Sequence, residues 1–327
     1  MTLLTTLLHA TNFSNPFLRT LIPSISLAYG IQGLVAVPSV LAQSERFYDL
    51  SGSFTYLSCT LLSLYLPALR ARAAAATLGA VKPAWPNVLG ALAGKAGAGL
   101  NWRQVVLSAA VSVWATRLGS YLFRRISADG SDSRFDSIRD SPPKFLGAFF
   151  AQATWVTLCL LPVLALNSLP ATLLSTVPAG IAITDIIGLL LYVGGLSFEV
   201  TADRQKDQWV HEKKQKKHDE DFLTRGLWSK SRHPNYFGEA TLWTGIATVA
   251  GGVLVSNVGQ VGMGLAGGLG GRALGLMMAG VSPAFVTFLL LKVSGVPLSE
   301  NKYDKRYGDR YDYQQWKKNT PMFVPKL

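Results

Sequence analysis

The residues best placed for chemistry are polar side chains at the ends of long apolar segments. The densest group, residues 229–239, reads SKSRHPNYFGE and opens into an apolar stretch. Pro234 suits the first turn of a helix and disfavours helical geometry at His233. A helix that begins there presents free backbone N–H groups and a positive dipole end beside Arg232 and His233, so the segment predicts an anion site.

Asn235, Tyr236 and Glu239 follow within the first turns of that helix. Spacings of three and four residues allow their amide, phenol and carboxylate to converge on one ligand. Gly238 lets the ligand, or a neighbouring helix, approach the backbone. A helix cap would explain Pro234 and Asn235, but it would not explain an acid and a tyrosine leading into an apolar span. A charge at bilayer depth costs about 2.5–3.5 kcal/mol on insertion scales, which favours a binding role.

A second acidic pair, Glu199 and Asp203, ends an earlier apolar segment. The two residues are four apart, so they share a face if the helix continues. Acids at a helix C-terminus face an unfavourable dipole, which cations such as Arg117 or ligand hydroxyls could offset. Arg117 lies inside another apolar segment, four residues before Tyr121. It is either a snorkelling arginine or an anion partner at the mouth of a cavity.

Three tyrosines recur every four residues near the end of the chain, at Tyr303, Tyr307 and Tyr311, among basic residues. This pattern is typical of an interfacial helix that holds its tyrosines at the headgroup level. The alternative is a polar lid that closes over the site. The residues before it, SGVP at 294–297, predict a break in the preceding helix.

Composition indicates which elements position these residues. AVILMFWYC residues make up 49% of the 327-residue chain and charged residues 15%, whereas soluble domains carry about 25% charged residues. A membrane-spanning helix needs about twenty apolar residues and satisfies its own backbone groups in lipid. We therefore predict an all-α, polytopic membrane bundle of about seven transmembrane helices. The expected spans are 20–42, 51–69, 105–123, 145–166, 181–200, 236–256 and 273–293.

The basic residues test this topology. Of the 31 Lys and Arg residues, 22 fall on the side of the bilayer that receives the C-terminus and 7 on the other side. Because Lys and Arg accumulate in cytoplasmic loops, we expect a cytosolic C-terminus and an outside N-terminus. The net charge of +12 is then explained by basic residues in the cytoplasmic loops and tail, so no nucleic-acid partner is expected.

Other site classes are excluded by spacing. The chain has only two cysteines, Cys59 and Cys159, and its four histidines lack the spacing of zinc motifs, so no metal site is expected. Residues 262–267 match GxGxxG, but no acid occurs between Glu239 and Glu300, as a dinucleotide fingerprint would require. We interpret residues 259–271 as a flexible, glycine-rich turn between two spans.

The ordered set of motifs resembles the steroid 5-alpha-reductase-like membrane family, and more closely its branch that carries RHPNYFGE. The resemblance covers roughly residues 103–327, so residues 1–102 are expected to form a two-helix region with an Ala/Gly-rich connector. RHPxYxG alone is moderately specific, since isoprenylcysteine carboxyl methyltransferases and sterol reductases share similar stretches. The motifs that carry the resemblance are WATRLGSYLF, DSRFD, FEVTADRQK, GLWSKSRHPNYFGE, LLLKVSGVP and the tyrosine-bearing tail ending in FVP.

The resemblance implies an NADPH-dependent oxidoreductase that reduces a carbon–carbon double bond conjugated to a carbonyl in a lipophilic, steroid, enoyl or polyprenoid-like substrate. It places cofactor contacts on Asn235, Tyr236, Glu239, Asp203 and Arg117, and on an aromatic of the C-terminal helix. That aromatic falls on Tyr303. The chain differs from the animal reductases in its RHP before the Asn and in lacking their histidine cluster before the tail, which bears on the steroid substrate more than on the cofactor.

We expect Arg232, His233 or loop lysines to hold the cofactor phosphates, while Tyr121 and Glu199 are the candidate catalytic donors to the substrate carbonyl. Two rivals are an S-adenosylmethionine-dependent methyltransferase of the isoprenylcysteine type and a non-catalytic lipid-binding or scaffold protein. The lipid bilayer is the expected surrounding and the endoplasmic reticulum the expected compartment. The sequence leaves the oligomeric state open.

Overall fold

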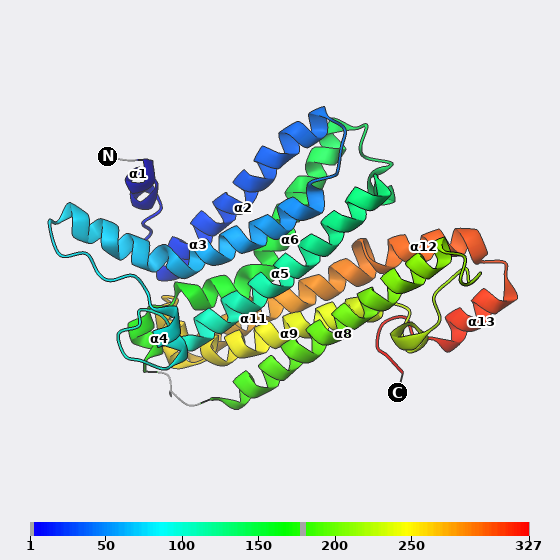
Figure 1. Cartoon of the computed structure of the whole chain (residues 1–327). Helices are drawn as coiled ribbons and strands as arrows, with labels where there is room; N and C mark the ends of the chain where they lie inside the picture. Colours follow the sequence, from blue (N-terminus) through cyan, green and yellow to red (C-terminus); the bar gives the residue numbers. More distant parts are fainter. Residues whose placement is uncertain (1–2, 177–180, 327) are drawn as a thin grey trace. The chain divides into compact units, whose positions relative to one another are not determined.

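The computed structural model of the chain describes residues 3–176 and 181–326, and all regular structure in those ranges is helical (Figure 1). The all-α prediction is therefore confirmed. The long helices are α2 (Pro16–Leu41), α3 (Tyr48–Thr77), α5 (Trp102–Asp129), α6 (Pro142–Ser168), α8 (Ile183–Lys214), α9 (Pro234–Leu254) and α11 (Gly268–Phe288). The shorter elements are α1 (Leu3–Ala10), α4 (Val88–Leu92), η1 (Ser133–Phe135), α7 (Ala171–Leu174), η2 (Gly226–Ser229), α10 (Asn257–Gly262), η3 (Leu289–Val293), α12 (Val296–Tyr307) and α13 (Tyr311–Asn319).

Five helical segments in the described ranges are long and apolar enough to cross a membrane, as in a multi-pass membrane protein. These are Pro16–Leu41, Trp102–Asp129, Pro142–Ser168, Ile183–Lys214 and Gly268–Tyr307. The helices α3 and α9 coincide with two other predicted spans but are not among these five. Serine and threonine recur along α3, and α9 contains Glu239 with several Gly and Thr residues. The count of seven spans stays a prediction.

The chain forms two compact units. The first contains Met1–Ile186 and Ile246–Ser282, and the second contains Ile187–Gly245 and Pro283–Leu327. The helices α8, α9 and α11 each contribute residues to both units. The expected division of the chain near residue 103 stays a prediction.

Helices α2, α3, α5 and α6 pack together in the first unit. Gln152 donates from Nε2 to Oε1 of Gln32 at 3.0 Å, and Gln32 donates to Oγ1 of Thr55 at 2.8 Å. Asn167 donates to Oγ of Ser63 at 2.9 Å. These hydrogen bonds hold the helices together. They matter in a membrane because lipid tails are as apolar as the helix surfaces, so apolar contacts between helices give little net stabilisation.

A buried ion pair also lies in the first unit. Arg103, in the first turn of α5, donates from Nε and Nη2 to the two carboxylate oxygens of Asp185 at 2.9 and 2.6 Å. The two side chains are 3% and 1% exposed. A pair in this geometry holds the start of α5 to the start of α8, because separating the charges would leave both unsolvated.

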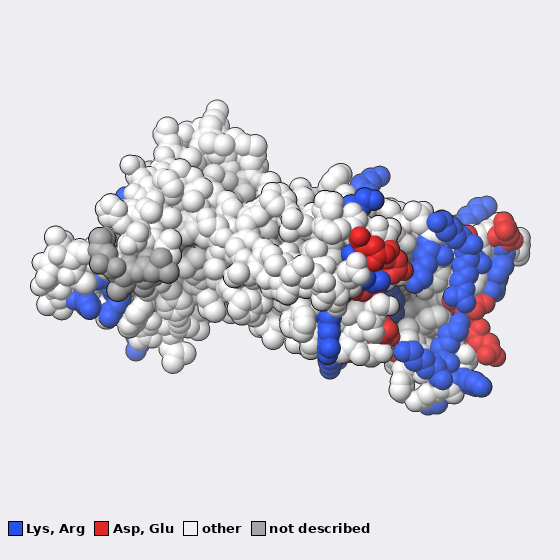
Figure 2. Space-filling view, turned by 90° about the horizontal axis from the view of Figure 1, so that it is seen from above, with Lys and Arg blue, Asp and Glu red and all other residues white. Residues whose placement is uncertain are grey.

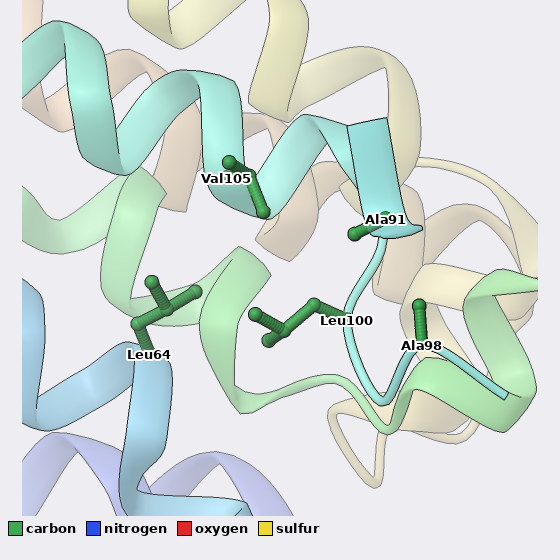
Figure 3. Close-up of a cluster of buried hydrophobic side chains, with 5 residues drawn as sticks. All are labelled: Leu64, Ala91, Ala98, Leu100 and Val105. Atoms are coloured by element: carbon green, nitrogen blue, oxygen red, sulfur yellow. The ribbon is translucent and has the colours of Figure 1, made fainter. Parts of the chain in front are cut away.

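The Ala/Gly-rich connector, residues 71–100, is packed against the first unit. Helix α3 extends into it as far as Thr77, and Asn87 caps the short helix α4 by accepting from the Gly90 N–H. Buried apolar side chains then join the connector to α3 and α5 (Figure 3). They are Leu64, Ala91, Ala98, Leu100 and Val105.

One expectation about loops needs correction and another is confirmed. Residues 259–271 are not one flexible turn, because α10 extends to Gly262 and α11 begins at Gly268. Gly264 and Gly267 in the link, and Gly268 at the start of α11, have positive φ values of +72°, +82° and +68°, which favour glycine. The helix break at 294–297 is confirmed, because α12 begins at Val296 after the π-helical turn η3.

The tyrosine-bearing tail is not one helix. Tyr303 and Tyr307 lie on α12 with ring centroids 6.0 Å apart, but α12 ends at Tyr307. Tyr311 begins α13 and is 75% exposed. The spacing of four therefore does not place the three tyrosines on one face.

Candidate functional site

Helices α8 and α9 are in backbone contact in the second unit. A Cβ added to Gly238 would lie 2.6 Å from the backbone nitrogen of Glu199, and one added to Gly195 would lie 2.5 Å from that of Leu242. Real Cβ atoms do not approach so closely, so only glycine fits at these positions. The contact places the first turns of α9 beside Gly195 and Glu199 of α8, just before the polar end of α8.

Asp203 and Asn235 meet at this contact. The Asn235 Nδ2 group donates to Oδ1 of Asp203 at 3.3 Å, and Asp203 is 5% exposed. The other amide atom, Asn235 Oδ1, is buried and has no hydrogen-bond partner among the described residues. A buried acceptor without a donor costs about 1–3 kcal/mol. The pair therefore offers a ready acceptor to a ligand N–H group.

Three more predicted residues lie on the same two helices. Glu199 is 3% exposed and one turn before Asp203, and α8 continues unbroken past both, so the expected shared face is confirmed. Tyr236 and Glu239 are half-buried in the first turns of α9. This part of the second unit thus carries three carboxylates, an amide and a phenol within two apolar helices.

Arg232 and His233, just before α9, are bound to a residue that the motifs did not single out. Glu300 of α12 accepts from Nη1 of Arg232 at 2.9 Å and from Nε2 of His233 at 3.2 Å. Lys317 of α13 also reaches Glu300, at 3.1 Å. Figure 2 shows the charged side chains gathered where α12 and α13 lie. One carboxylate thereby fixes two of the predicted anion-binding residues.

His233 is a neutral, oriented imidazole. Burial lowers the pKa of His233 below its ordinary value, and the hydrogen bond with Glu300 offsets this only in part. A neutral ring near pH 7 donates from Nε2 to the carboxylate. Its other side stacks on Tyr236, with ring centroids 5.4 Å apart and an interplanar angle of 7°.

The C-terminal segment 320–326 lies along the turn that leads into α9. The backbone N–H of Arg232 donates to the Pro321 carbonyl at 2.9 Å, and the Ser231 hydroxyl donates to the Phe323 carbonyl at 2.8 Å. The His233 N–H is taken by the Ser231 hydroxyl at 3.1 Å. The predicted anion site therefore has fewer free backbone donors than expected, because the N–H groups of Arg232 and His233 are already hydrogen-bonded within the protein.

A small pocket, with a cavity volume of about 40 Å³ and partly open to solvent, lies beside Arg232 and His233 within the second unit. It also contacts Tyr303, which the resemblance had selected. The remaining lining residues are Lys206, Trp209, Phe222, Leu223, Trp228, Ser299, Glu300, Tyr313 and Trp316. Its lining combines aromatic side chains with a few charged groups.

Arg117 and Tyr121 lie on α5 in the first unit. The Arg117 guanidinium is 5.5 Å from the centroid of the Tyr121 ring, a cation–π contact. The other eight predicted residues lie in the second unit. The expectation that Arg117 shares one cavity with them stays a prediction. No three His, Cys, Asp or Glu side chains of the described ranges lie together as metal ligands would.

Comparison with known proteins gives a family for this chain. A family model described as a protein of unknown function, DUF1295, matches residues 71–266 and 269–320. The chain belongs to the DUF1295 family. No curated protein and no solved structure matches it.

The matched part of this DUF1295 protein includes every predicted site residue and the whole pocket. Sequence reasoning missed Glu300 and the pocket aromatics. Glu300 carried a signal, since it is the first acid after Glu239 along the chain. The tryptophans carried none, because tryptophan near a membrane surface is common and their meeting depends on the fold of residues 205–230 and 296–320.

Proposed function

We propose that this DUF1295 protein is a membrane oxidoreductase that uses NADPH to reduce a carbon–carbon double bond conjugated to a carbonyl in a lipophilic substrate. The family is associated with steroid 5-alpha-reductase-like proteins, which agrees with the motif resemblance. The apolar helices suit a substrate dissolved in lipid. The observation that carries the proposal is the buried, unfilled acceptor of Asn235.

The residues around Asn235 fit a carboxamide ligand. Asn235 Nδ2 already donates to Asp203. This hydrogen bond orients the amide and leaves Oδ1 available to accept from a ligand donor. A nicotinamide carboxamide has an N–H₂ group that matches this acceptor and a carbonyl that would accept from Tyr236. A hydride carrier must be held in one orientation, so positioning is the main contribution of these residues.

When bound, NADPH supplies the hydride for the β-carbon of the conjugated system. The protein then has two tasks at the substrate: to polarise the carbonyl and to deliver a proton to the α-carbon. Glu199 is buried, at 3% exposure, and a carboxylic acid in its protonated form could donate a hydrogen bond to the substrate carbonyl. Glu199 and Tyr121 remain the proposed donors.

The anionic part of the cofactor is assigned to the turn before α9. Arg232 is held by Glu300 through Nη1, which fixes its guanidinium plane, and Tyr303 lies on the same pocket. We place this end and the C-terminus in the cytosol, where NADPH is available, from the distribution of the basic residues. The proposed compartment is the endoplasmic reticulum.

Equilibrium binding of NADPH to the protein purified in detergent tests the proposal. We expect saturable binding, and we expect Asn235→Ala to weaken it about tenfold through loss of one hydrogen bond. The matched control is Asn301→Ala, the same change at an exposed position of α12. Wild-type affinity in Asn235→Ala would remove this residue from the site. Absence of NADPH binding together with saturable S-adenosylmethionine binding would replace the reductase by a methyltransferase.

A further inference from the structure

The Ala/Gly-rich connector, residues 71–100, exposes large apolar side chains that the proposed reaction does not use. Its middle, residues 80–87, has no regular secondary structure and runs as an open trace from the end of α3 to α4 (Figure 1). The exposed large apolar residues of the connector are Leu78, Val81, Trp85, Leu89 and Leu92. Val81 is 95% exposed. Apolar side chains that gather on an exposed segment indicate a surface that meets a membrane or a partner.

The charged residues of the connector are all basic. They are Arg72, Lys82 and Lys95, and both lysines are exposed. No Asp or Glu occurs in residues 50–128, so no acid on the neighbouring stretches of chain offsets these cations. An apolar surface with basic residues is complementary to the headgroup layer of a bilayer, where phosphate groups lie above acyl chains. A second copy of the chain would bring like charges together, which disfavours a dimer through this surface.

Arg72 and Trp85 link the connector to the end of α3. The Arg72 guanidinium lies 4.5 Å from the centroid of the Trp85 ring, and its Nη1 group donates to the Pro83 carbonyl. Trp85 is itself 53% exposed. Tryptophan is enriched at the membrane–water interface, and a neighbouring arginine can extend its charged end to the phosphates. The pair therefore suits a segment that lies at the level of the headgroups.

The length of α3, one of the predicted spans, agrees with this level. The helix has 30 residues, which at 1.5 Å per residue gives a length of about 45 Å. The hydrocarbon core of a bilayer is roughly 30 Å thick, and the bilayer with its headgroups roughly 40–45 Å. A span of this length that begins in one headgroup layer ends in the other. Residues 80–87 cannot lie deeper, because backbone groups outside a helix need water or headgroups as hydrogen-bond partners.

We propose that the connector docks onto the phospholipid headgroup layer of the bilayer. Val81 and Trp85 insert among the upper parts of the acyl chains, while Arg72, Lys82 and Lys95 contact phosphate groups. Because the three cations act together and no acid opposes them, the surface prefers anionic phospholipids to zwitterionic ones. This interaction does not depend on the proposed reaction, since it uses none of the residues assigned to it.

Fluorescence quenching in reconstituted vesicles tests the position of the connector. Both native cysteines are buried, so a bimane label can be attached to the full-length protein through Val81→Cys. We expect lipids that carry a nitroxide close to the headgroup to quench this label more strongly than aqueous iodide does. The matched control is Asp219→Cys, at an exposed position in the loop after α8, beyond the predicted span 181–200. There we expect quenching by iodide and little quenching by the lipids.

Two lysine changes test the role of charge. Quenching by nitroxide-labelled phosphatidylglycerol and phosphatidylcholine, each at increasing mole fraction, gives the relative association of the two lipids with the labelled connector. We expect a preference of about three- to tenfold for phosphatidylglycerol. Combining Lys82→Gln with Lys95→Gln should lower this preference about threefold or more. The matched control combines Lys216→Gln with Lys217→Gln, two exposed lysines after α8, and should leave the preference unchanged.

Three outcomes would overturn the proposal or part of it. Quenching of the label at position 81 by iodide but not by lipid would place the connector in water, and the docking proposal would be wrong. Protection from both quenchers, together with disulfide cross-linking between two copies of Val81→Cys protein, would replace lipid by a second copy of the chain. Equal lipid preferences in the two double lysine variants would show that Lys82 and Lys95 do not contact headgroups.

Discussion

At the scale of residues, the most informative feature is a small set of buried polar atoms that the protein leaves without partners. Asn235 Oδ1, Arg232 Nε and Trp316 Nε1 all lie in the second unit and are buried. Native proteins satisfy most such groups internally, so each exception calls for an explanation, and a ligand is the one proposed for Asn235. The sequence predicted Asn235 and Arg232 from the motif at the helix start. It could not predict Trp316, because its surroundings come from segments far apart in the chain.

The Arg103–Asp185 pair gives a stability prediction at this scale. Asp185→Asn should lower the thermal unfolding midpoint in detergent and cost about 3–5 kcal/mol, because it leaves a buried guanidinium without its charge partner. The control is Asp49→Asn, which removes one partner of Arg134, a residue that is 38% exposed and keeps Asp132. That change should cost about 0–1 kcal/mol. Equal effects of the two variants would contradict the buried pairing.

Glu45 gives a pH prediction. Burial raises the pKa of this carboxyl, but the hydrogen bonds from Arg139 and the Asp132 N–H outweigh burial and hold the pKa below its ordinary value of 4.5. A lowered folded-state pKa stabilises the protein above the unfolded value, and that stability is lost as the pH falls through the folded value. The unfolding midpoint should therefore drop below about pH 4.5.

Glu45→Gln tests the cause of this pH dependence. The gap in unfolding midpoint between wild type and variant should be full at neutral pH and shrink on acidification. Asp136→Asn, at a side chain that is 63% exposed and also near Arg139, serves as the control. A gap that stays constant down to acidic pH would show that Glu45 does not contribute through its charge.

At the scale of elements, the sequence predicted where the important helices begin and break. Pro234 does start α9, and the polar end of α8 does continue as a helix. Proline and helix-face spacing are local signals, so the structures they predict depend little on the rest of the fold. The prediction of a single helix for the tyrosine-bearing tail was wrong, because the spacing of four between tyrosines does not indicate the helix break between Tyr307 and Tyr311. The fold of residues 71–100 depends on contacts that no local pattern encodes.

The contact between α8 and α9 gives a prediction at this scale. Gly238→Ala places a Cβ 2.6 Å from the Glu199 backbone nitrogen and 2.7 Å from the Gly195 carbonyl. Since backbone atoms cannot move aside, the helices must separate, at a cost of about 1–3 kcal/mol. We expect a lower unfolding midpoint and weaker NADPH binding, because the Asp203–Asn235 hydrogen bond spans this contact.

Gly194→Ala is the matched control, one residue from the contact on α8. A Cβ at Gly194 has no neighbour within 4 Å, and alanine favours a helix over glycine by about 1 kcal/mol. This variant should keep the NADPH affinity and should leave the unfolding midpoint equal to or above that of the wild type. If Gly238→Ala behaved like Gly194→Ala, close helix packing would not be what positions the site.

At the scale of the whole molecule, the apolar helices fit a multi-pass membrane protein, and the proposed function requires the second unit to bind a nucleotide and the helices to admit a lipid substrate. Composition and hydropathy predicted the membrane setting, since those signals are spread along the chain. The chemistry depends on a few residues. Its direct test is therefore whether hydrogen moves from the cofactor into a lipid.

The decisive measurement uses NADPH that carries deuterium at the transferable position of the nicotinamide. The purified protein is incubated with this cofactor and a lipid extract, and the products are analysed by mass spectrometry. We predict a reduced lipid that carries one deuterium on carbon, formed more slowly by Asn235→Ala below saturating NADPH and at the wild-type rate by Asn301→Ala. A protein that binds NADPH yet yields no deuterated lipid, or that transfers a methyl group from S-adenosylmethionine instead, would contradict the account.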